Sequence, residues 1–73
     1  MRIKHILGMQ VVDRDARILG KVSDLDFDDE EGIINNIVIS HKTGVISKDD
    51  IVINFNDIES IGDYILLKLN IKE

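Results

Sequence analysis

The chain of 73 residues has no cysteine, no proline and no tryptophan, and only three aromatic side chains, Phe27, Phe55 and Tyr64. Without cysteine, neither a disulfide nor a thiolate-bound metal can hold so short a chain together. A single domain over residues 1–73 is expected to be stable by only about 4–11 kcal/mol. Its stability must therefore come from a well-packed aliphatic core, rich in isoleucine, or from self-association.

The sequence also lacks long apolar runs and clusters of basic residues. Residues 1–7 do not contain the apolar stretch of a signal peptide, and no segment approaches the roughly 20 apolar residues of a membrane-spanning helix. The net charge is −5 and the isoelectric point is near 4.8, so the surface repels phosphate backbones and anionic lipids. We expect a cytoplasmic protein without direct contact to nucleic acid and without membrane insertion. A membrane-associated partner is compatible with these features.

Recognisable catalytic groupings are absent from the sequence. His5 and His41 are far apart, the four serines at positions 23, 40, 47 and 60 stand in no nucleophile motif, and there is no glycine-rich phosphate loop. His41 is followed by Lys42 and Thr43, which favours a solvated loop histidine over a metal ligand. We therefore predict that the protein is not an enzyme and has no catalytic residues, no cofactor and no metal site.

What the sequence does contain is a pattern of short strands. Glycines at positions 8, 20, 32, 44 and 62 mark turns at the spacing of a small all-β domain. Strands are predicted over residues 10–12, 18–28, 33–40, 51–55 and 64–69. They are separated by a polar turn at 13–17, an acidic turn at 29–32 and a polar loop at 41–50.

The longest predicted strand changes phase along its length. Ile18 and Val22 point to one face, whereas Leu25 and Phe27 point to the other, because side chains in a strand alternate with a period of two. A β-bulge would return both sets to the inside and would let a short sheet curl. We therefore predict a bulge within two residues of Ser23.

A one-turn helical cap is predicted over residues 56–61, between the last two strands. Asn56 can accept hydrogen bonds from the first free N–H groups, and Glu59 follows three residues later, as in a capping box. Ile58 and Ile61 would then share one face and plug one end of the domain. The glycine after the cap stands where a positive φ is often required.

An acidic block supplies six carboxylates in eight positions: Asp24, Asp26, Asp28, Asp29, Glu30 and Glu31. Clustered carboxylates suit Ca²⁺, but an EF-hand loop does not fit, because Asp29 replaces its glycine and Asn35 its bidentate glutamate. We prefer a solvated strand face and hairpin tip that discourages aggregation. Weak cation binding and a surface for a basic partner are the alternatives. The smaller group of Asp57, Glu59 and Asp63 is interpreted as cap and turn residues.

Apolar residues occupy both predicted faces of the sheet. Strand alternation places one set inward: Ile33, Ile37, Ile39, Ile51, Ile53, Phe55, Ile65, Leu67 and Leu69. It places a second set outward: Ile34, Val38, Val52, Tyr64 and Leu66. Surplus apolar surface usually marks an interface, and cyclic dimers are the commonest oligomers. We predict a homodimer through the outward set. The alternative is that loops and termini cover it.

Three stretches resemble the PRC-barrel domain family. They are LGMQVVD at residues 7–13, ILGKVSDL at residues 18–25 and FNDIESIGD at residues 55–63. The resemblance extends over about residues 6–69. It implies a small, strongly bent antiparallel β-barrel of five to six strands, with a one-turn helical cap before the last strand and no enzymatic activity.

The chain departs from the family pattern at two points. Ala16 or Arg17 stands where the first turn of the family usually carries a glycine, and Asn54 stands where proline is frequent. Neither change threatens the implied fold.

The resemblance also indicates a class of function. Family members act as interaction modules in photosynthetic complexes, ribosome assembly, sporulation and cell division, and short stand-alone members are typical of archaea and some bacteria. We therefore predict a homodimeric protein–protein adaptor, acting in an FtsZ-based archaeal cell-division assembly or another membrane-proximal assembly. The alternative is an RNA-metabolism or ribosome-maturation factor that resembles the barrel domain of RimM, which can bind a ribosomal protein in place of RNA.

Overall fold

The computed structural model describes residues 1–41 and 50–71. The loop predicted at 41–50 therefore lies almost entirely outside the described residues. In chain order, the elements are α1 (Ile3–Ile6), β1 (Gln10–Val12), β2 (Ile18–Asp28), β3 (Ile33–His41), β4 (Ile51–Asn54), the 3-10 helix η1 (Phe55–Asp57), β5 (Ile58–Ile61) and β6 (Ile65–Leu67).

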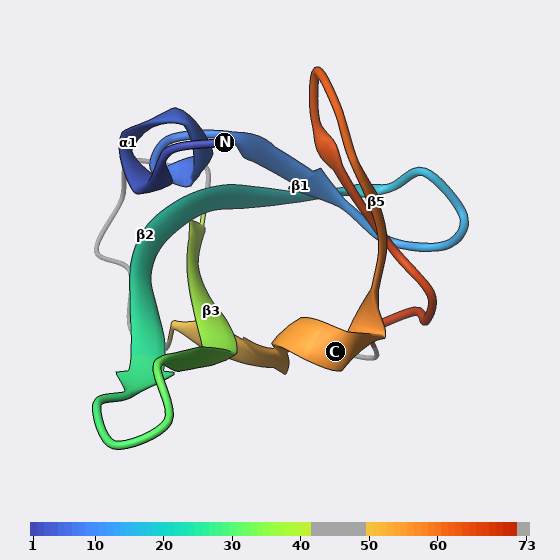
Figure 1. The fold of residues 1–73 in the computed structure, drawn as a ribbon. Coiled ribbons are helices and arrows are strands. Elements are labelled where there is room, and N and C mark those ends of the chain that lie inside the picture. Colours follow the sequence, from blue (N-terminus) through green and yellow to red (C-terminus); the bar gives the residue numbers. More distant parts are fainter. Residues whose placement is uncertain (42–49, 72–73) are drawn as a thin grey trace.

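The six strands of the described residues form one strongly bent sheet in the order β4-β3-β2-β1-β6-β5. Neighbouring strands are antiparallel, except that β1 and β6 run parallel. The predicted all-β class with a strong bend is confirmed. In the described part of the chain, hydrogen bonds do not close the sheet into a barrel. The chain itself links the two edges, because η1 connects edge strand β4 directly to edge strand β5 (Figure 1).

The core is aliphatic and lies on the concave side of the bend. Its buried members are Ile6, Val11, Val22, Ile37, Ile39, Ile53, Ile65 and Leu67. The five of these on β3, β4 and β6 are members of the predicted inward set. Burying each such side chain favours folding by about 1.5–3 kcal/mol. Ile6 belongs to α1, a short helix that the strand pattern did not predict and that lies beside the bend of β2 (Figure 1).

Two bulges bend the β2–β3 hairpin. Val22 pairs with Ile39 and Asp24 with Val38, so Ser23 is the extra residue on β2. This confirms the predicted bulge, and the Ser23 hydroxyl donates to the carbonyl oxygen of Val38 at 3.3 Å. A second irregularity falls on β3, because the pairs Asp26–Asn36 and Phe27–Ile34 skip Asn35.

The second bulge corrects part of the predicted core. Strand alternation predicts that Ile33 points inward, but its side chain is 51% exposed. The extra residue Asn35 reverses the side-chain parity of the first part of β3, so the alternation counted back from Ile37 fails there. Beyond the bulge, Ile37 and Ile39 are fully buried as predicted.

The predicted cap is wrong in extent and in its capping residue. The helical turn covers Phe55–Asp57, and the side chain of Asn54 accepts from the Asn56 N–H at 2.8 Å. Residues 58–61 form strand β5 and not a helix, Glu59 is exposed, and Gly62 is outside the left-handed region.

Pairing of β5 with β6 explains why the cap ends early. Ile58 lies opposite Leu67 and Ile61 opposite Ile65, with a bulge between Ile58 and Ser60. The bulge places both isoleucines against the core, so they still cover one end of the domain, but from a strand. Strand β6 is also shorter than predicted, and Tyr64 belongs to the preceding bend.

Gly20 is the position at which β2 passes closest to another backbone. It pairs with Val11 of β1 on one side and with His41 of β3 on the other. A Cβ atom at Gly20 would lie 1.9 Å from the carbonyl oxygen of Ser40, and the φ of Gly20 is 154°. Only glycine fits this contact without a shift of the backbone.

We predict that Gly20→Ala lowers the free energy of unfolding by about 3 kcal/mol or more, since the new methyl group meets a backbone oxygen that cannot rotate away. Urea denaturation followed by circular dichroism measures the change. Gly62→Ala is the matched control, because a Cβ there meets nothing within 4 Å, and it should change stability by less than about 0.5 kcal/mol. Equal stability of the two variants would contradict the close contact at Gly20.

Candidate interaction surfaces

The first surface is an apolar pair on the convex side of β3 and β4. Val38 lies directly opposite Val52 in the antiparallel ladder. Their neighbours Ile37, Ile39 and Ile53 are buried in the core, so Val38 and Val52 point to the other face. Val38 is half-buried and Val52 is 57% exposed. We call Val38 and Val52 the outer pair; the prediction that both point outward is confirmed.

Two other predicted interface residues lie elsewhere on the sheet. Tyr64, 48% exposed, belongs to the bend before β6, and Leu66 is half-buried within β6. Leu66 pairs with Val12 of β1 and Ser60 of β5. In the sheet order, β1 and β2 separate β6 from β3. Tyr64 and Leu66 are therefore not ladder neighbours of the outer pair.

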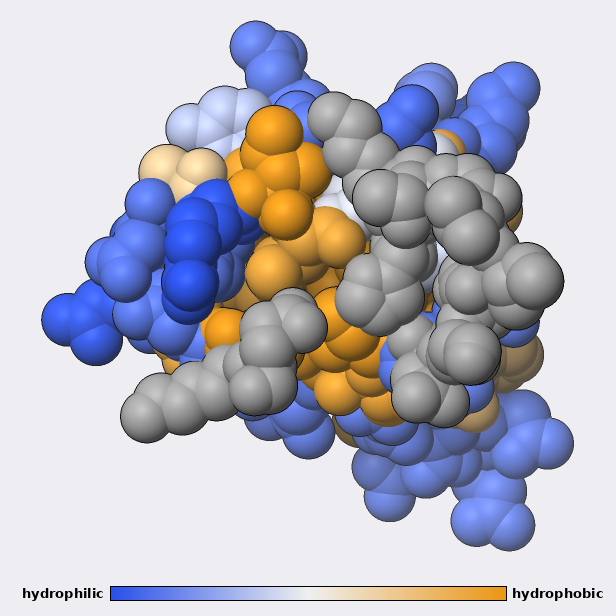
Figure 2. Space-filling view, turned by 180° about the vertical axis from the view of Figure 1, so that it is seen from behind, coloured by the Kyte–Doolittle hydropathy of each residue, from blue (hydrophilic) through white to orange (hydrophobic). Residues whose placement is uncertain are grey.

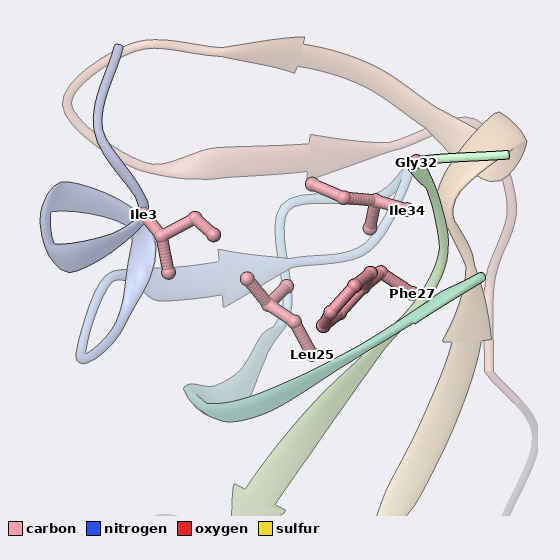
Figure 3. A pocket seen from close by; sticks show the side chains of 5 residues that line it. All are labelled: Ile3, Leu25, Phe27, Gly32 and Ile34. Carbon is pink, nitrogen blue, oxygen red and sulfur yellow. The ribbon is translucent and has the colours of Figure 1, made fainter. Parts of the chain in front are cut away.

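The fifth predicted residue, Ile34, lines a pocket and does not join the outer pair. The extra residue Asn35 changes its parity, so Ile34 lies opposite Phe27. The pocket has a volume of about 320 Å³ and is lined by Ile3, Leu25, Phe27, Gly32 and Ile34. Figure 3 shows the four larger side chains pointing toward one another between α1 and the β2–β3 hairpin. The prediction that Ile34 and Val38 share a face is wrong.

The face opposite to the view of Figure 1 is also apolar at its centre. Figure 2 shows hydrophobic atoms gathered at the centre of this view, with hydrophilic side chains to the left, above and below. A chain of this size therefore presents apolar surface in more than one direction, as expected of a domain that binds other proteins.

Three carboxylates of the acidic block accept hydrogen bonds within their own hairpin. Asp28 Oδ1 accepts from the backbone N–H groups of Glu30 at 2.9 Å and Glu31 at 3.3 Å, and Asp24 Oδ1 accepts from the Leu25 N–H at 2.8 Å. Asp26 Oδ2 accepts from the Asn36 amide at 3.4 Å. Among residues 1–41 and 50–71, no three His, Cys, Asp or Glu side chains converge in a way that could hold a metal ion.

A buried carboxylate organises the turn at 13–17, which the sequence indicated only as polar. Asp13 is fully buried. Its Oδ1 accepts from the N–H groups of Asp15 at 3.0 Å and Arg17 at 2.9 Å, and its Oδ2 accepts from Arg17 Nε at 2.9 Å. An Asp followed by Arg four residues later, directly after an apolar strand, was the available signal. Within this turn Ala16 has a φ of 67°, at the place where the family pattern has glycine.

The electrostatics of Asp13 favour its charged form. Burial raises the pKa of its carboxyl group. This effect is outweighed by hydrogen bonds from the backbone and side chain of Arg17, by the positive charge of Arg17, and by the backbone hydrogen bond from Asp15. The pKa is therefore lowered from 3.8. The same turn is tied to the end of the chain, because the Arg14 N–H donates to the Leu69 carbonyl and Asp15 and Asn70 bond reciprocally. Asp13 is therefore a structural group of the fold.

Serine hydroxyls near the bend are used in the same structural way. The Ser23 and Ser40 hydroxyls donate to the carbonyl oxygens of Val38 and Lys21, at 3.3 and 3.4 Å. His5 is exposed on α1, and the side chain of His41 lies outside the described part of the structure.

A comparison with models of protein families identifies the family of this chain. The model of the PRC-barrel domain matches residues 1–71. The chain belongs to the PRC-barrel domain family. A search of curated proteins finds no match to this PRC-barrel chain. In the described residues, no helix has both the length and the apolar character needed to cross a membrane.

For this PRC-barrel domain, the Asp13 geometry predicts a pH dependence. A carboxyl group whose pKa is lower in the folded state stabilises the fold above its unfolded pKa of 3.8, and this stabilisation is lost as the pH falls through the folded value. The wild type should therefore be more stable than Asp13→Asn at pH 5–8, and the difference should shrink below about pH 3.8. Urea denaturation of both proteins across this range measures it. A difference that grows on acidification would contradict the assignment.

The acidic hairpin predicts little response to calcium. Asp24 and Asp28 bond backbone N–H groups of their own hairpin, and no three carboxylates of the described residues converge on one point. Millimolar Ca²⁺ should therefore leave the melting temperature within about 1 °C of its starting value. The same concentration of Mg²⁺ controls for ionic strength. A rise of several degrees with Ca²⁺ alone would show a cation site in the acidic block.

Proposed function

We propose that this PRC-barrel domain is a non-enzymatic protein–protein adaptor that functions as a homodimer. Membership of the family supports the general class of interaction module. The observation that carries the homodimer is the outer pair, two apolar side chains in direct cross-strand contact on the solvent side of the sheet.

The position of the outer pair suits a two-fold interface. Val52 lies on β4, an edge strand that pairs with β3 on one side and with no described residue on the other. Val52 is central to the short strand Ile51–Asn54. A second copy related by a two-fold axis would place the same apolar pair against itself, which is the usual geometry of a cyclic dimer.

A non-enzymatic role agrees with how the polar groups are used. The buried carboxylate of Asp13 is hydrogen-bonded within its own turn, and the hydroxyls of Ser23 and Ser40 donate to backbone carbonyls. Within the described residues, these groups are engaged in holding the bend. The pocket is lined by apolar side chains and one glycine, a composition suited to binding and not to acid–base chemistry.

The cellular process that we propose is an FtsZ-based archaeal cell-division assembly or another membrane-proximal assembly in the cytoplasm. This finer assignment rests on the resemblance to short stand-alone PRC-barrel proteins. The net charge of −5 supports a protein partner over RNA. A RimM-like role in ribosome maturation is the competing function.

The homodimer predicts a specific sensitivity to charge at the outer pair. Val52→Lys should weaken self-association by at least about tenfold, because it places a charge at the apolar contact, and sedimentation velocity at tens of micromolar should then show monomer. Phe27→Lys, which changes an exposed residue of the pocket, is the matched control and should leave the dimer intact. A wild type that sediments only as monomer, or a dimer that Val52→Lys does not affect, would contradict the proposal.

The cellular assignment is tested by affinity purification of the tagged protein from its native lysate, with mass spectrometry of bound proteins. Enrichment of division or membrane-tethering proteins that is lost with Val52→Lys or Phe27→Lys would support the adaptor. Salt-resistant enrichment of ribosomal proteins would instead establish the ribosome-maturation role.

A further inference from the structure

The pocket on the β2–β3 hairpin is an apolar recess that the fold itself leaves unfilled. Leu25 and Phe27 come from β2, and Ile34 comes from β3, just before the bulged residue Asn35. Ile3 comes from α1 (Figure 3). Phe27 is 64% exposed and Ile3 is 52% exposed. Exposing a large aromatic side chain beside other apolar groups is unfavourable in water, so the recess favours an apolar occupant.

The size and lining of the pocket limit what it can hold. About 320 Å³ is at the lower end of ligand-binding cavities, enough for one large side chain or two small ones. None of the five lining residues has a polar side chain, so nothing there would orient a polar metabolite by hydrogen bonds. An apolar side chain presented by another protein fits this pocket better than a small polar ligand.

The charges around the pocket are distributed unequally. Gly32, in the pocket wall, ends the hairpin turn that contains Asp29, Glu30 and Glu31, and all three acidic side chains are exposed. On the α1 side the wall is Ile3, which lies between Arg2 and Lys4. The structure records no ion pair between these two sides within residues 1–41 and 50–71. An acidic turn thus adjoins the pocket wall at Gly32, and two basic residues adjoin it at Ile3.

From this geometry we propose that the pocket binds a peptide segment of a partner protein that carries one large apolar side chain with lysine or arginine on one flank. The apolar side chain enters the recess among Leu25, Phe27 and Ile34, and the basic flank lies over the hairpin tip. A basic group on the other flank would meet Arg2 and Lys4, so the segment binds in one direction. This inference rests on the proposed adaptor function and names the chemistry of its partner.

The charge arrangement distinguishes this occupant from the outer pair of a second copy of the chain. The chain's own apolar outer pair lies in β3 and β4, where Val38 is next to Ile37 and Ile39 and Val52 is next to Ile51 and Ile53, so neither valine has a basic neighbour. The adaptor therefore has two separate surfaces, the outer pair for its own copy and the pocket for its partner. A dimer broken by Phe27→Lys and not by Val52→Lys would show instead that a second copy fills the pocket.

The test is selection of a random displayed-peptide library on the full-length protein. We expect enriched peptides with Leu, Ile, Met, Phe or Trp next to Lys or Arg on one flank. These peptides should bind Phe27→Lys and Phe27→Ala at least about tenfold more weakly than the wild type, and should bind Val52→Lys as the wild type does. A double change, Glu30→Gln with Glu31→Gln, should weaken them roughly 2- to 10-fold and reduce their salt dependence.

Each other result overturns the proposal. No enriched family, enrichment of neutral or acidic peptides, or unchanged binding to both Phe27 variants would show that the pocket does not read this chemistry. Melting curves of the variants would check that they are folded, which is expected because Phe27 and Val52 are largely exposed. The peptide selection can fail while the wild-type protein is still a dimer that Val52→Lys disrupts. This combination would overturn the pocket proposal and leave the proposed adaptor function intact.

Discussion

The backbone contact at Gly20 is the constraint on which the rest of this structure depends. At this residue β2 is hydrogen-bonded to β1 and β3, and its Cα faces the carbonyl oxygen of Ser40 with no room for a side chain. Because one strand belongs to both halves of the sheet, its bend places Val11, Ile65 and Leu67 from one half against Ile37, Ile39 and Ile53 from the other. By folding one sheet over itself in this way, a short chain buries an aliphatic core between two halves of the same sheet.

The bulges that accompany the bend also determine what the surface can bind. The extra residue Ser23 reverses the inward–outward alternation of side chains along β2, and the extra residue Asn35 does the same along β3. A regular hairpin would place Ile34 beside Val38 in one outer strip. With Asn35 inserted, Ile34 turns to the pocket and Val38 remains with Val52 outside. One apolar face thereby becomes two surfaces with different charge surroundings. In the function that we propose, one surface binds a second copy and the other binds a partner protein.

Most of the strand pattern could be predicted, because apolar alternation and glycine turns are local signals. The bulge at Ser23 was visible as a change of phase between Val22 and Leu25. The bulge at Asn35 was hidden, because Ile33 and Ile34 are both apolar and show no break. The spacing of Ile58 and Ile61 fits one helical turn and a bulged strand equally well, and only pairing with β6 decides between them. The partners of Asp13 are local, but its complete burial depends on how the sheet packs around the turn. The position of Ile3 in the pocket depends on a short helix that the strand pattern did not predict.

The separation of the two surfaces is tested most directly by methyl NMR during dilution of the wild-type protein. We expect the methyl signals of Val38 and Val52 to shift with concentration as the dimer dissociates, while those of Ile3, Leu25 and Ile34 stay in place. Concentration-dependent shifts at the pocket methyls, with constant signals from Val38 and Val52, would contradict it and assign self-association to the pocket.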